Sequence, residues 1–264
     1  MSNKIKSISD PKLRVEVLSQ DEISRLHTAT LDIIENVGVK FPSLKALEIW
    51  EGHGAQVDRQ SFVVKAPGHL VEQALKNAPP AYDLAARDAD QDLSLDGNHV
   101  YVGTDGCGVE VLDIYSGERR RSQLQDVADI ARIADALEEV AFHWVAVSAQ
   151  DRPPESRGLH ELGAIWENST KHVQTESVYS TREAQAAVEM AAVIAGGRQA
   201  LRQRPVLSLM QCSASPLGQD GGSLDAALIA AEAGIPVGFM TMAACLTTGP
   251  ATMAGNLLVG NAEV

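Results

Sequence analysis

The spacing of apolar residues changes near residue 100 of this 264-residue chain, and the change predicts two regions. Before it, short helices and strands alternate without a repeat. A first helix is expected from a Ser19–Glu22 capping box, apolar positions at helical spacing over 23–37, and Gly38 as its left-handed end. Helices over 44–50 and 67–76 and strands over 55–57 and 62–64 follow, so an α+β cap over 18–99 is expected behind a flexible arm, 1–17.

After residue 100, apolar strand-like runs recur every ~30–40 residues, which is the length of a βα unit. The runs are Val100–Gly103, Val140–Ala149, His172–Thr175, Val206–Gln211 and Ile235–Met240. Capping boxes at Ser122–Gln125 and Ser180–Glu183 predict two intervening helices, and Leu224–Ala233 forms a third. The runs are too apolar for half-exposed strands, which indicates parallel strands covered on both faces.

This alternation fits either a barrel or a doubly wound sheet. No G-x-G-x-x-G follows the first run and no G-x-x-x-x-G-K-[ST] occurs in the chain, which disfavours a nucleotide-binding doubly wound fold. We therefore predict an α/β fold of the (β/α)8 TIM-barrel type over 100–264. A complete barrel usually needs ~250 residues, and only about five βα units are found. A truncated enzyme is expected, and an intact smaller α/β protein is the alternative.

Composition narrows the class of protein. The formal net charge is −13, which argues against a nucleic-acid partner. The three cysteines, Cys107, Cys212 and Cys245, form no CxxC pair, so neither a disulfide framework nor a zinc knuckle is expected. The start of the chain has no apolar leader and no apolar run is long enough to span a membrane, so a cytoplasmic location is expected.

Three segments resemble the trimethylamine methyltransferase family. Residues 101–137 carry a similar Gly-rich strand end and Gly-Xaa-Arg turn, and WENSTKHVQTES is similar to the family's Asn-Thr-Lys-Pro strand, with His172 where Pro is usual. The third and most specific segment, 215–263, matches a Ser-Pro-Leu loop, a Gly-Ile-Pro-Val strand and a Gly-Pro-Ala-Thr-Xaa-Ala-Gly helix start. It looks closer to the branch without pyrrolysine, which includes glycine betaine methyltransferases, and the resemblance runs from Leu18 to the last residue.

The resemblance implies an enzyme that moves a methyl group from a tertiary or quaternary amine, of the trimethylamine or glycine betaine type, to the cobalt of a corrinoid protein. The chain itself would then bind no metal and no cofactor, because the methylcobamide is carried by that partner. In archaeal relatives a pyrrolysine takes part, at a position that lies beyond residue 264. A homo-oligomer is also expected, since a partial barrel leaves open strand edges.

Candidate site residues follow from the rule that barrel chemistry lies at the carboxyl ends of the strands. A methylated cation is held by carboxylates or aromatic faces, and no base is needed. Asp105 and Glu176 are the candidate catalytic residues; alternatively, Asp105 caps its turn and Glu176 forms a salt bridge. The candidate substrate-binding residues are Tyr101, Thr104, Gln174, Gln211, Ser213, Thr247 and Thr248.

Several alternatives stay open. His172 is interpreted as a core histidine bonded to backbone. A helix start at Gly249–Pro250 would offer amide N–H groups to a substrate carboxylate or would simply be capped by the preceding threonines. The arginines 119–121 are interpreted as a solvated turn, and contact with a corrinoid partner is the alternative. The competing functions are a zinc-dependent barrel methyltransferase, because the cysteines fall near strand ends, and a non-catalytic fragment acting in assembly.

Overall fold

The computed structural model describes residues 5–9 and 16–264, which form two compact units interleaved along the chain. Of the described residues, unit 1 combines 5–9, 81–210 and 226–238, and unit 2 combines 16–80, 211–225 and 239–264. The domain boundaries expected from the sequence, 17/18 and 99/100, stay a prediction.

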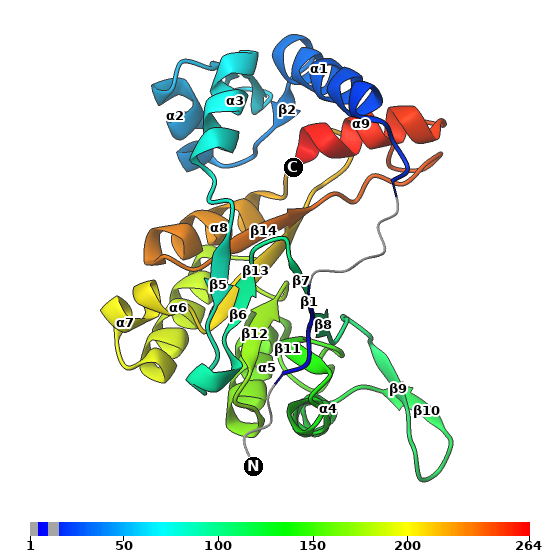
Figure 1. Ribbon diagram of the computed structural model, residues 1–264, viewed down its shortest axis with the longest axis vertical. Coiled ribbons are helices and arrows are strands. Elements are labelled where there is room, and N and C mark those ends of the chain that lie inside the picture. Colours follow the sequence, from blue (N-terminus) through cyan, green and yellow to red (C-terminus); the bar gives the residue numbers. More distant parts are fainter. Residues whose placement is uncertain (1–4, 10–15) are drawn as a thin grey trace. The chain divides into compact units, whose positions relative to one another are not determined.

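The centre of unit 1 is a five-stranded sheet whose strands follow one another in chain order. Its neighbours pair in parallel, and a backbone bond from Leu209 N to Pro236 O joins β13 to the last strand. A doubly wound sheet reverses its strand order at a switch point, and this sheet does not. The result is a mixed α/β fold with a curved parallel half-barrel (Figure 1). The strands are β8 (Val102–Gly103), β11 (Val140–Trp144), β12 (His172–Thr175), β13 (Leu207–Cys212) and β14 (Val237–Met240).

Helices cover one face of this sheet, which we call the outer face. Its buried core joins alanine-rich helix faces to strand residues such as Val173, Leu207 and Leu209. Alternate strand residues point to the opposite, inner face, which is why Phe142, Gln174 and Met210 are only half-buried. The helices are α4 (Leu124–Ala136), α5 (Arg157–Asn168), α6 (Thr181–Ala195), α7 (Arg198–Gln203) and α8 (Gly221–Ala233), with 3-10 turns at Ala89–Gln91 and Pro154–Ser156.

Three short antiparallel pairs in unit 1 were not indicated by the spacing of apolar residues, and the arginines 119–121, interpreted as a turn, form a strand in one of them. Their strands have two or three residues each, too few to show a period-two pattern. The hairpin of residues 82–95 lies against the amino ends of the parallel strands, where Leu84 and Leu93 are buried and Phe142 packs against them. The pairs are β1 (Ile8–Ser9) with β7 (His99–Val100), β5 (Tyr82–Leu84) with β6 (Leu93–Leu95), and β9 (Glu110–Leu112) with β10 (Arg119–Arg121).

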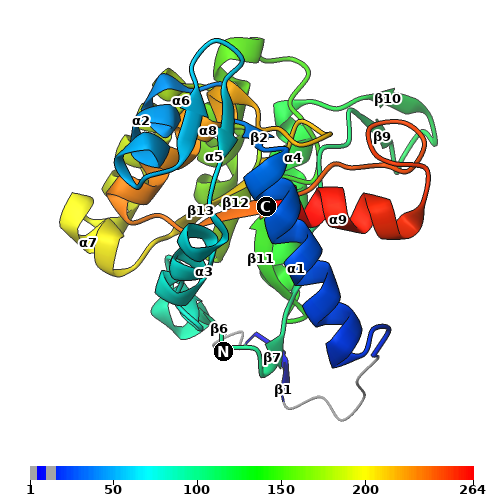
Figure 2. The same cartoon turned by 90° about the horizontal axis from the view of Figure 1, so that it is seen from above.

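Unit 2 builds a small α+β structure around a three-stranded antiparallel sheet. Helix α1 packs against the last helix, α9 (Figure 2), and Asn261 Nδ2 donates to Thr30 Oγ1 at 3.0 Å between them. None of the helices in the described ranges is long and apolar enough to cross a membrane. The elements are α1 (Gln20–Asn36), β2 (Val39–Lys40), α2 (Leu44–Gly52), β3 (Gln56–Asp58), β4 (Val63–Lys65), α3 (Gly68–Asn77) and α9 (Met253–Glu263).

The predicted helix ends can be checked against the observed caps. The Ser19–Glu22 capping box is present, and Gly38 has φ 92°, where a Cβ would collide with Val64 O and Val63. Ser180 caps α6 and accepts from Glu183 N, as predicted, and the helix ends at left-handed Gly196. The capping box predicted at Ser122–Gln125 is wrong by one position: Gln123 and Asp126 form it, because Ser122 is buried and donates to Ser148 O at 2.6 Å.

The strand predicted over 140–149 is shorter than expected. It ends at Trp144 because the following backbone pairs with a loop instead of with a strand. Val145 O and Ala146 O accept from Cys107 N and Gly108 N, both at 3.1 Å. This pairing fastens the loop that follows β8 to the chain that follows β11.

Candidate functional site

The loop after β8 carries two of the predicted site residues at the carboxyl end of the sheet. Thr104 Oγ1 accepts from Trp144 N at 2.8 Å and donates to Trp144 O, so it joins this loop to β11. Asp105 is exposed and accepts from Gly106 N at 2.8 Å. The turn-capping role considered for Asp105 is therefore present, and its carboxylate still faces solvent. Its catalytic role stays a prediction.

Trp144 is the aromatic residue that the sequence reasoning missed. It lies two residues after Phe142, in unbroken register with Gln174 of β12, so it points to the inner face at the carboxyl end of β11. A Cβ on Gly106 would lie 3.1 Å from Trp144 Cδ1, which places the indole beside the loop of Asp105. The available signal was the period-two spacing from Phe142.

The end of β12 supplies the next pair of predicted residues. Gln174 is half-buried on the inner face and lies level with Trp144. Glu176 follows the strand by one residue and is also half-buried. Three neighbouring strands thus bring polar and aromatic side chains to one end of unit 1. We call this set the rim, and it consists of Thr104, Asp105, Trp144, Gln174 and Glu176.

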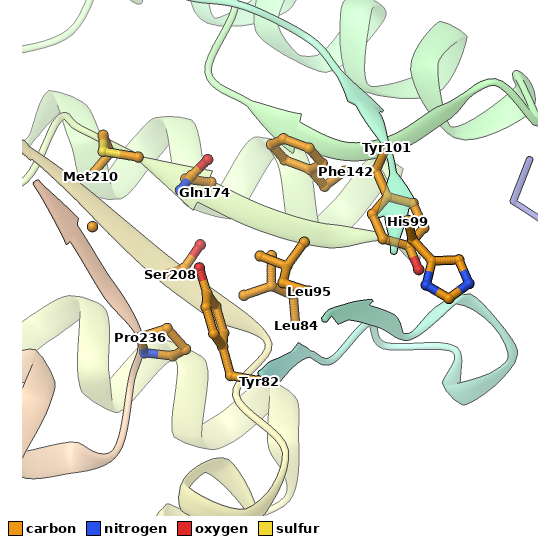
Figure 3. Close-up of a pocket in the computed structure, with 11 residues that line it drawn as sticks. Tyr82, Leu84, Leu95, His99, Tyr101, Phe142, Gln174, Ser208, Met210 and Pro236 are labelled. Atoms are coloured by element: carbon orange, nitrogen blue, oxygen red, sulfur yellow. The ribbon is translucent and has the colours of Figure 1, made fainter. Parts of the chain in front are cut away.

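Below the rim, a pocket of about 310 Å³ lies between the inner face and the β5–β6 hairpin (Figure 3). Its hairpin side is lined by Tyr82, Leu84 and Leu95, and Gln174 lies at the sheet side. Tyr101, predicted to lie at a strand end, is instead at the amino end of β8, where its hydroxyl accepts from Ser94 N at 3.3 Å. Tyr101 and Gln174 therefore line one pocket, with Tyr101 away from the rim.

His172 has the structural role that the sequence suggested. Its ring is fully buried on the inner face, where Nδ1 donates to Ala85 O at 2.8 Å and Nε2 accepts from Ser208 Oγ at 2.9 Å. A carbonyl accepts only, so Nδ1 carries the proton. Burial lowers the pKa of His172 to about 4, and the ring is neutral at neutral pH. His172 therefore connects the β5–β6 hairpin to the sheet through hydrogen bonds.

The residues just before His172 are also structural. Lys171 is buried and its ammonium donates to Ala134 O, Leu137 O and Val140 O at 2.7, 2.7 and 2.6 Å, which closes the carboxyl end of α4. Burial lowers the pKa of Lys171. Beside it, Ser169 Oγ donates to Asp135 Oδ1 at 2.8 Å. Residues 169–172 therefore connect helix α4, the β5–β6 hairpin and strands β11 and β13.

Unit 2 contains a buried carboxylate surrounded by hydroxyl groups. Glu263, only 3% exposed, accepts from Ser213 Oγ and Ser215 Oγ at 2.6 Å, from Thr241 Oγ1 at 2.7 Å and from Leu217 N at 2.9 Å. Burial by itself would raise the pKa of Glu263, but the hydrogen bonds from these hydroxyls and from Leu217 outweigh it and lower the pKa below its usual value. The predicted residue Ser213 also accepts from Met242 N at 2.9 Å. Glu263 therefore connects the loops that follow β13 and β14.

The other predicted residues of unit 2, Gln211, Thr247 and Thr248, have their own local roles. Gln211 is buried on the face of β13 opposite to Met210 and Cys212. Thr247 Oγ1 donates to Ala244 O at 3.2 Å and Thr248 Oγ1 to Met242 O at 2.9 Å, so both close their own turn.

The helix start predicted at Gly249–Pro250 is wrong. Helix α9 begins at Met253. Its N-cap is Thr252, whose hydroxyl accepts from Gly255 N at 3.1 Å, while the threonines before Gly249 are already used in the preceding turn.

The zinc alternative can be compared with the side chains that the structure places. None of Cys107, Cys212 and Cys245 forms a disulfide. Within residues 5–9 and 16–264, no three His, Cys, Asp or Glu side chains are grouped so that they could hold a metal ion.

Comparison with known proteins shows which family this chain is similar to. The family model described as trimethylamine methyltransferase (MTTB) matches residues 1–264. Trimethylamine methyltransferase MttB of Desulfitobacterium hafniense is 37% identical over 246 residues, which cover 93% of this chain and 49% of that protein. The glycine betaine methyltransferase of D. hafniense is 31% identical over 252 residues, 95% of this chain and 52% of that protein. MttB1 of Methanosarcina acetivorans is 30% identical over 261 residues, 96% of this chain and 52% of that protein. The chain thus spans about half the length of these relatives.

Proposed function

Because the chain belongs to the trimethylamine methyltransferase family, we propose that it forms the amine-binding part of a methyltransferase. The substrate is a tertiary or quaternary methylamine, of the kind named for its relatives, trimethylamine or glycine betaine. The acceptor is the cobalt of a corrinoid protein. In the family-length protein, the five strands of unit 1 belong to a complete (β/α)8 barrel.

One observation carries the proposal at the level of residues: Trp144 lies at the end of β11, between the strand ends that bear Asp105 and Glu176. The indole is half-buried on the inner face, in register with Gln174. An aromatic face attracts a methylated ammonium ion, and Trp does so most strongly. Carboxylates on the two flanking strands add long-range attraction for the same positive charge. The rim thus has the chemistry that a methylated cation requires.

Asp105 and Glu176 need not transfer a proton in this reaction. Reduced cobalt supplies the electron pair of the new carbon–cobalt bond, and the electron pair of the broken carbon–nitrogen bond leaves with the amine. A quaternary ammonium loses no proton in this step, so Asp105 and Glu176 act by charge and not as bases. Trp144 and Gln174 would orient the cation so that one methyl group faces the incoming cobalt in line.

A binding measurement tests the proposal on the chain itself. Titration with glycine betaine or with trimethylammonium should change the tryptophan fluorescence of the chain. The change should disappear in Trp144→Phe, which keeps Trp50 and Trp166 as internal references. Trp166→Phe is the matched control, because Trp166 is buried in the outer-face core. A signal that follows Trp166, or no saturable signal with any methylamine, would refute the proposed site.

A transfer measurement tests the reaction. The family-length protein, mixed with a corrinoid protein reduced to the cobalt(I) state, should form methylcobalt from one methylamine of a panel, as followed by the cobalt absorption spectrum. Asp105→Asn should reduce this rate, because an amide removes the negative charge and keeps the shape. The proposal fails if no methylamine methylates the cobalt while the protein is folded.

A further inference from the structure

Residues 109–121 form an arm that leaves the body of unit 1. Strands β9 and β10 pair as an antiparallel ribbon, with Val111 opposite Arg120 and Leu112 opposite Arg119. Figure 1 shows this ribbon projecting away from α4. A two-stranded ribbon by itself is only marginally stable in water, so its anchoring determines whether it is a defined structural feature.

The arm is anchored at its base and closed at its tip. Arg120 makes a two-pronged ion pair with Asp126 of α4, with both N–O distances 2.8 Å, and Val111 packs against the outer-face core. At the tip, Asp113 Oδ1 accepts from Tyr115 N and Ser116 N at 3.1 and 3.0 Å. The ribbon is therefore a formed projection and not a loose loop.

The tip of the arm exposes large apolar side chains. Tyr115 is 93% exposed, Ile114 85% and Leu112 68%, and no other large apolar side chain of the described residues is more exposed than Tyr115. Summed with Val109 at the base of the arm, these side chains offer roughly 500 Å² of apolar surface, which is within the range of the largest apolar patch on a typical soluble protein. A rigid arm that ends in such a patch is typical of an association element.

We propose that the arm binds a second copy of this chain, by exchange of two arms about a two-fold axis. The area supports this partner. One arm buries roughly 500 Å² on each side, which is below the ~800 Å² per partner of a stable interface. Two exchanged arms bury roughly 1,000 Å² per copy, because each copy donates one arm and receives the other.

Charge supports the same partner. Between residues 109 and 121, the acidic Glu110, Asp113 and Glu118 balance the three arginines, so the arm is formally neutral in a chain of net charge −13. Arg119 is paired with Glu110 at 2.8 Å, so little of its charge is left for another protein. Two copies repel each other over most of their acidic surface. Contact through the arm avoids this electrostatic repulsion, because the arm is formally neutral and its exposed tip is apolar.

The oligomeric state of the 264-residue chain tests the proposal, whether or not the chain transfers methyl groups. Sedimentation across a hundredfold concentration range should give a monomer–dimer equilibrium for the unmodified chain. The double substitution Ile114→Ser, Tyr115→Ser should raise the dimer dissociation constant at least tenfold. Both side chains are exposed, so far-ultraviolet circular dichroism should be unchanged.

Val193→Ser is the matched control, because Val193 is also an exposed apolar residue, 80% exposed on α6, outside the arm. It should leave the dissociation constant unchanged. The proposal is overturned if the unmodified chain stays monomeric, if the double variant dimerises as tightly as the unmodified chain, or if Val193→Ser weakens the dimer equally. It is also overturned if the double variant loses only binding to a corrinoid protein, because the arm then serves that partner.

Discussion

Replacing Glu263 by glutamine removes the charge at the centre of the hydroxyl cluster in unit 2 and keeps the size of the side chain. The carboxylate accepts four hydrogen bonds, three from hydroxyl groups and one from Leu217 N. The glutamine amide has one acceptor oxygen, and its NH2 group faces either Leu217 N–H or the three hydroxyl groups, so between one and three of these bonds, about two, are lost.

The size of the effect follows from these contacts. A hydrogen bond to a charged acceptor contributes about 1.5–3 kcal/mol, and a neutral bond contributes about 1 kcal/mol. Some of the hydroxyl groups rotate to new partners, so we expect Glu263→Gln to lower the free energy of unfolding by about 2 kcal/mol. For a chain of this size that lowers Tm by roughly 4–8 °C. Glu155→Gln is the matched control, since Glu155 is exposed on the surface, and its Tm should not change.

The pH dependence gives the prediction a second test. The pKa of Glu263 is lower in the folded chain than its usual value of 4.5. Its stabilisation is therefore present above the unfolded pKa and is lost as the pH falls through the folded pKa. The difference in Tm between the two chains should be largest near neutral pH and should shrink in acid. Equal stability of Glu263→Gln and Glu155→Gln at neutral pH, or a difference that does not change with pH, would refute the reasoning.

Three further predictions concern unit 1. Lys171→Met should lower the free energy of unfolding by about 3 kcal/mol in chemical denaturation, because three carbonyls at the end of α4 lose their donor. Burial lowers the pKa of His143 and His172 to about 4, below the unfolded value of ~6.5. Between pH ~6.5 and about 4, the two histidines are protonated in the unfolded chain and not in the folded chain, so the free energy of unfolding should fall as the solution is acidified. Tm measured across this pH range should fall less in His143→Gln than in the unmodified chain. Gly106→Ala should destabilise the rim loop and weaken methylamine binding in the fluorescence titration, because its Cβ would collide with Val145 O. A Gly52→Ala control, where a Cβ meets nothing within 4 Å, should bind normally.

The parts of the fold that repeat could be predicted from the sequence. The parallel strands are buried on the outer face by helices, so apolar runs such as 207–212 identify them. The absence of a nucleotide-binding turn favoured a barrel, and in the structure the strands follow one another in chain order. The capping boxes at Ser19 and Ser180 were read correctly because side chain and backbone bond locally there. At Ser122 the same pattern was misleading, since a distant carbonyl, Ser148 O, takes the hydroxyl.

The candidate site was less predictable because it depends on contacts between distant residues. Period-two spacing from Phe142 indicates the face on which Trp144 lies, but its place beside Gln174, 30 positions along the chain, appears only in the strand register. Glu263 lies in an apolar helix, and nothing in its neighbourhood indicates that hydroxyl groups from the loops after β13 and β14 surround it. Tyr101 precedes its strand instead of ending it, because the run over 100–103 is divided between β7 and β8.

These contacts separate two kinds of residue within the segments that resemble the family. Lys171 and His172 are buried and their polar atoms are bonded to backbone carbonyls and to Ser208, so they specify the assembly of the sheet, α4 and the hairpin. Asp105 is exposed and accepts a hydrogen bond within its own turn, and Trp144 is half-buried beside that loop, so charged and aromatic surface remains at the strand ends. A substitution of the first kind should act on stability and leave binding by the folded fraction unchanged. A substitution of the second kind should act mainly on methylamine binding and change unfolding less than one at Lys171 or His172. That division can be measured on the same samples, because tryptophan fluorescence reports binding and circular dichroism reports folding.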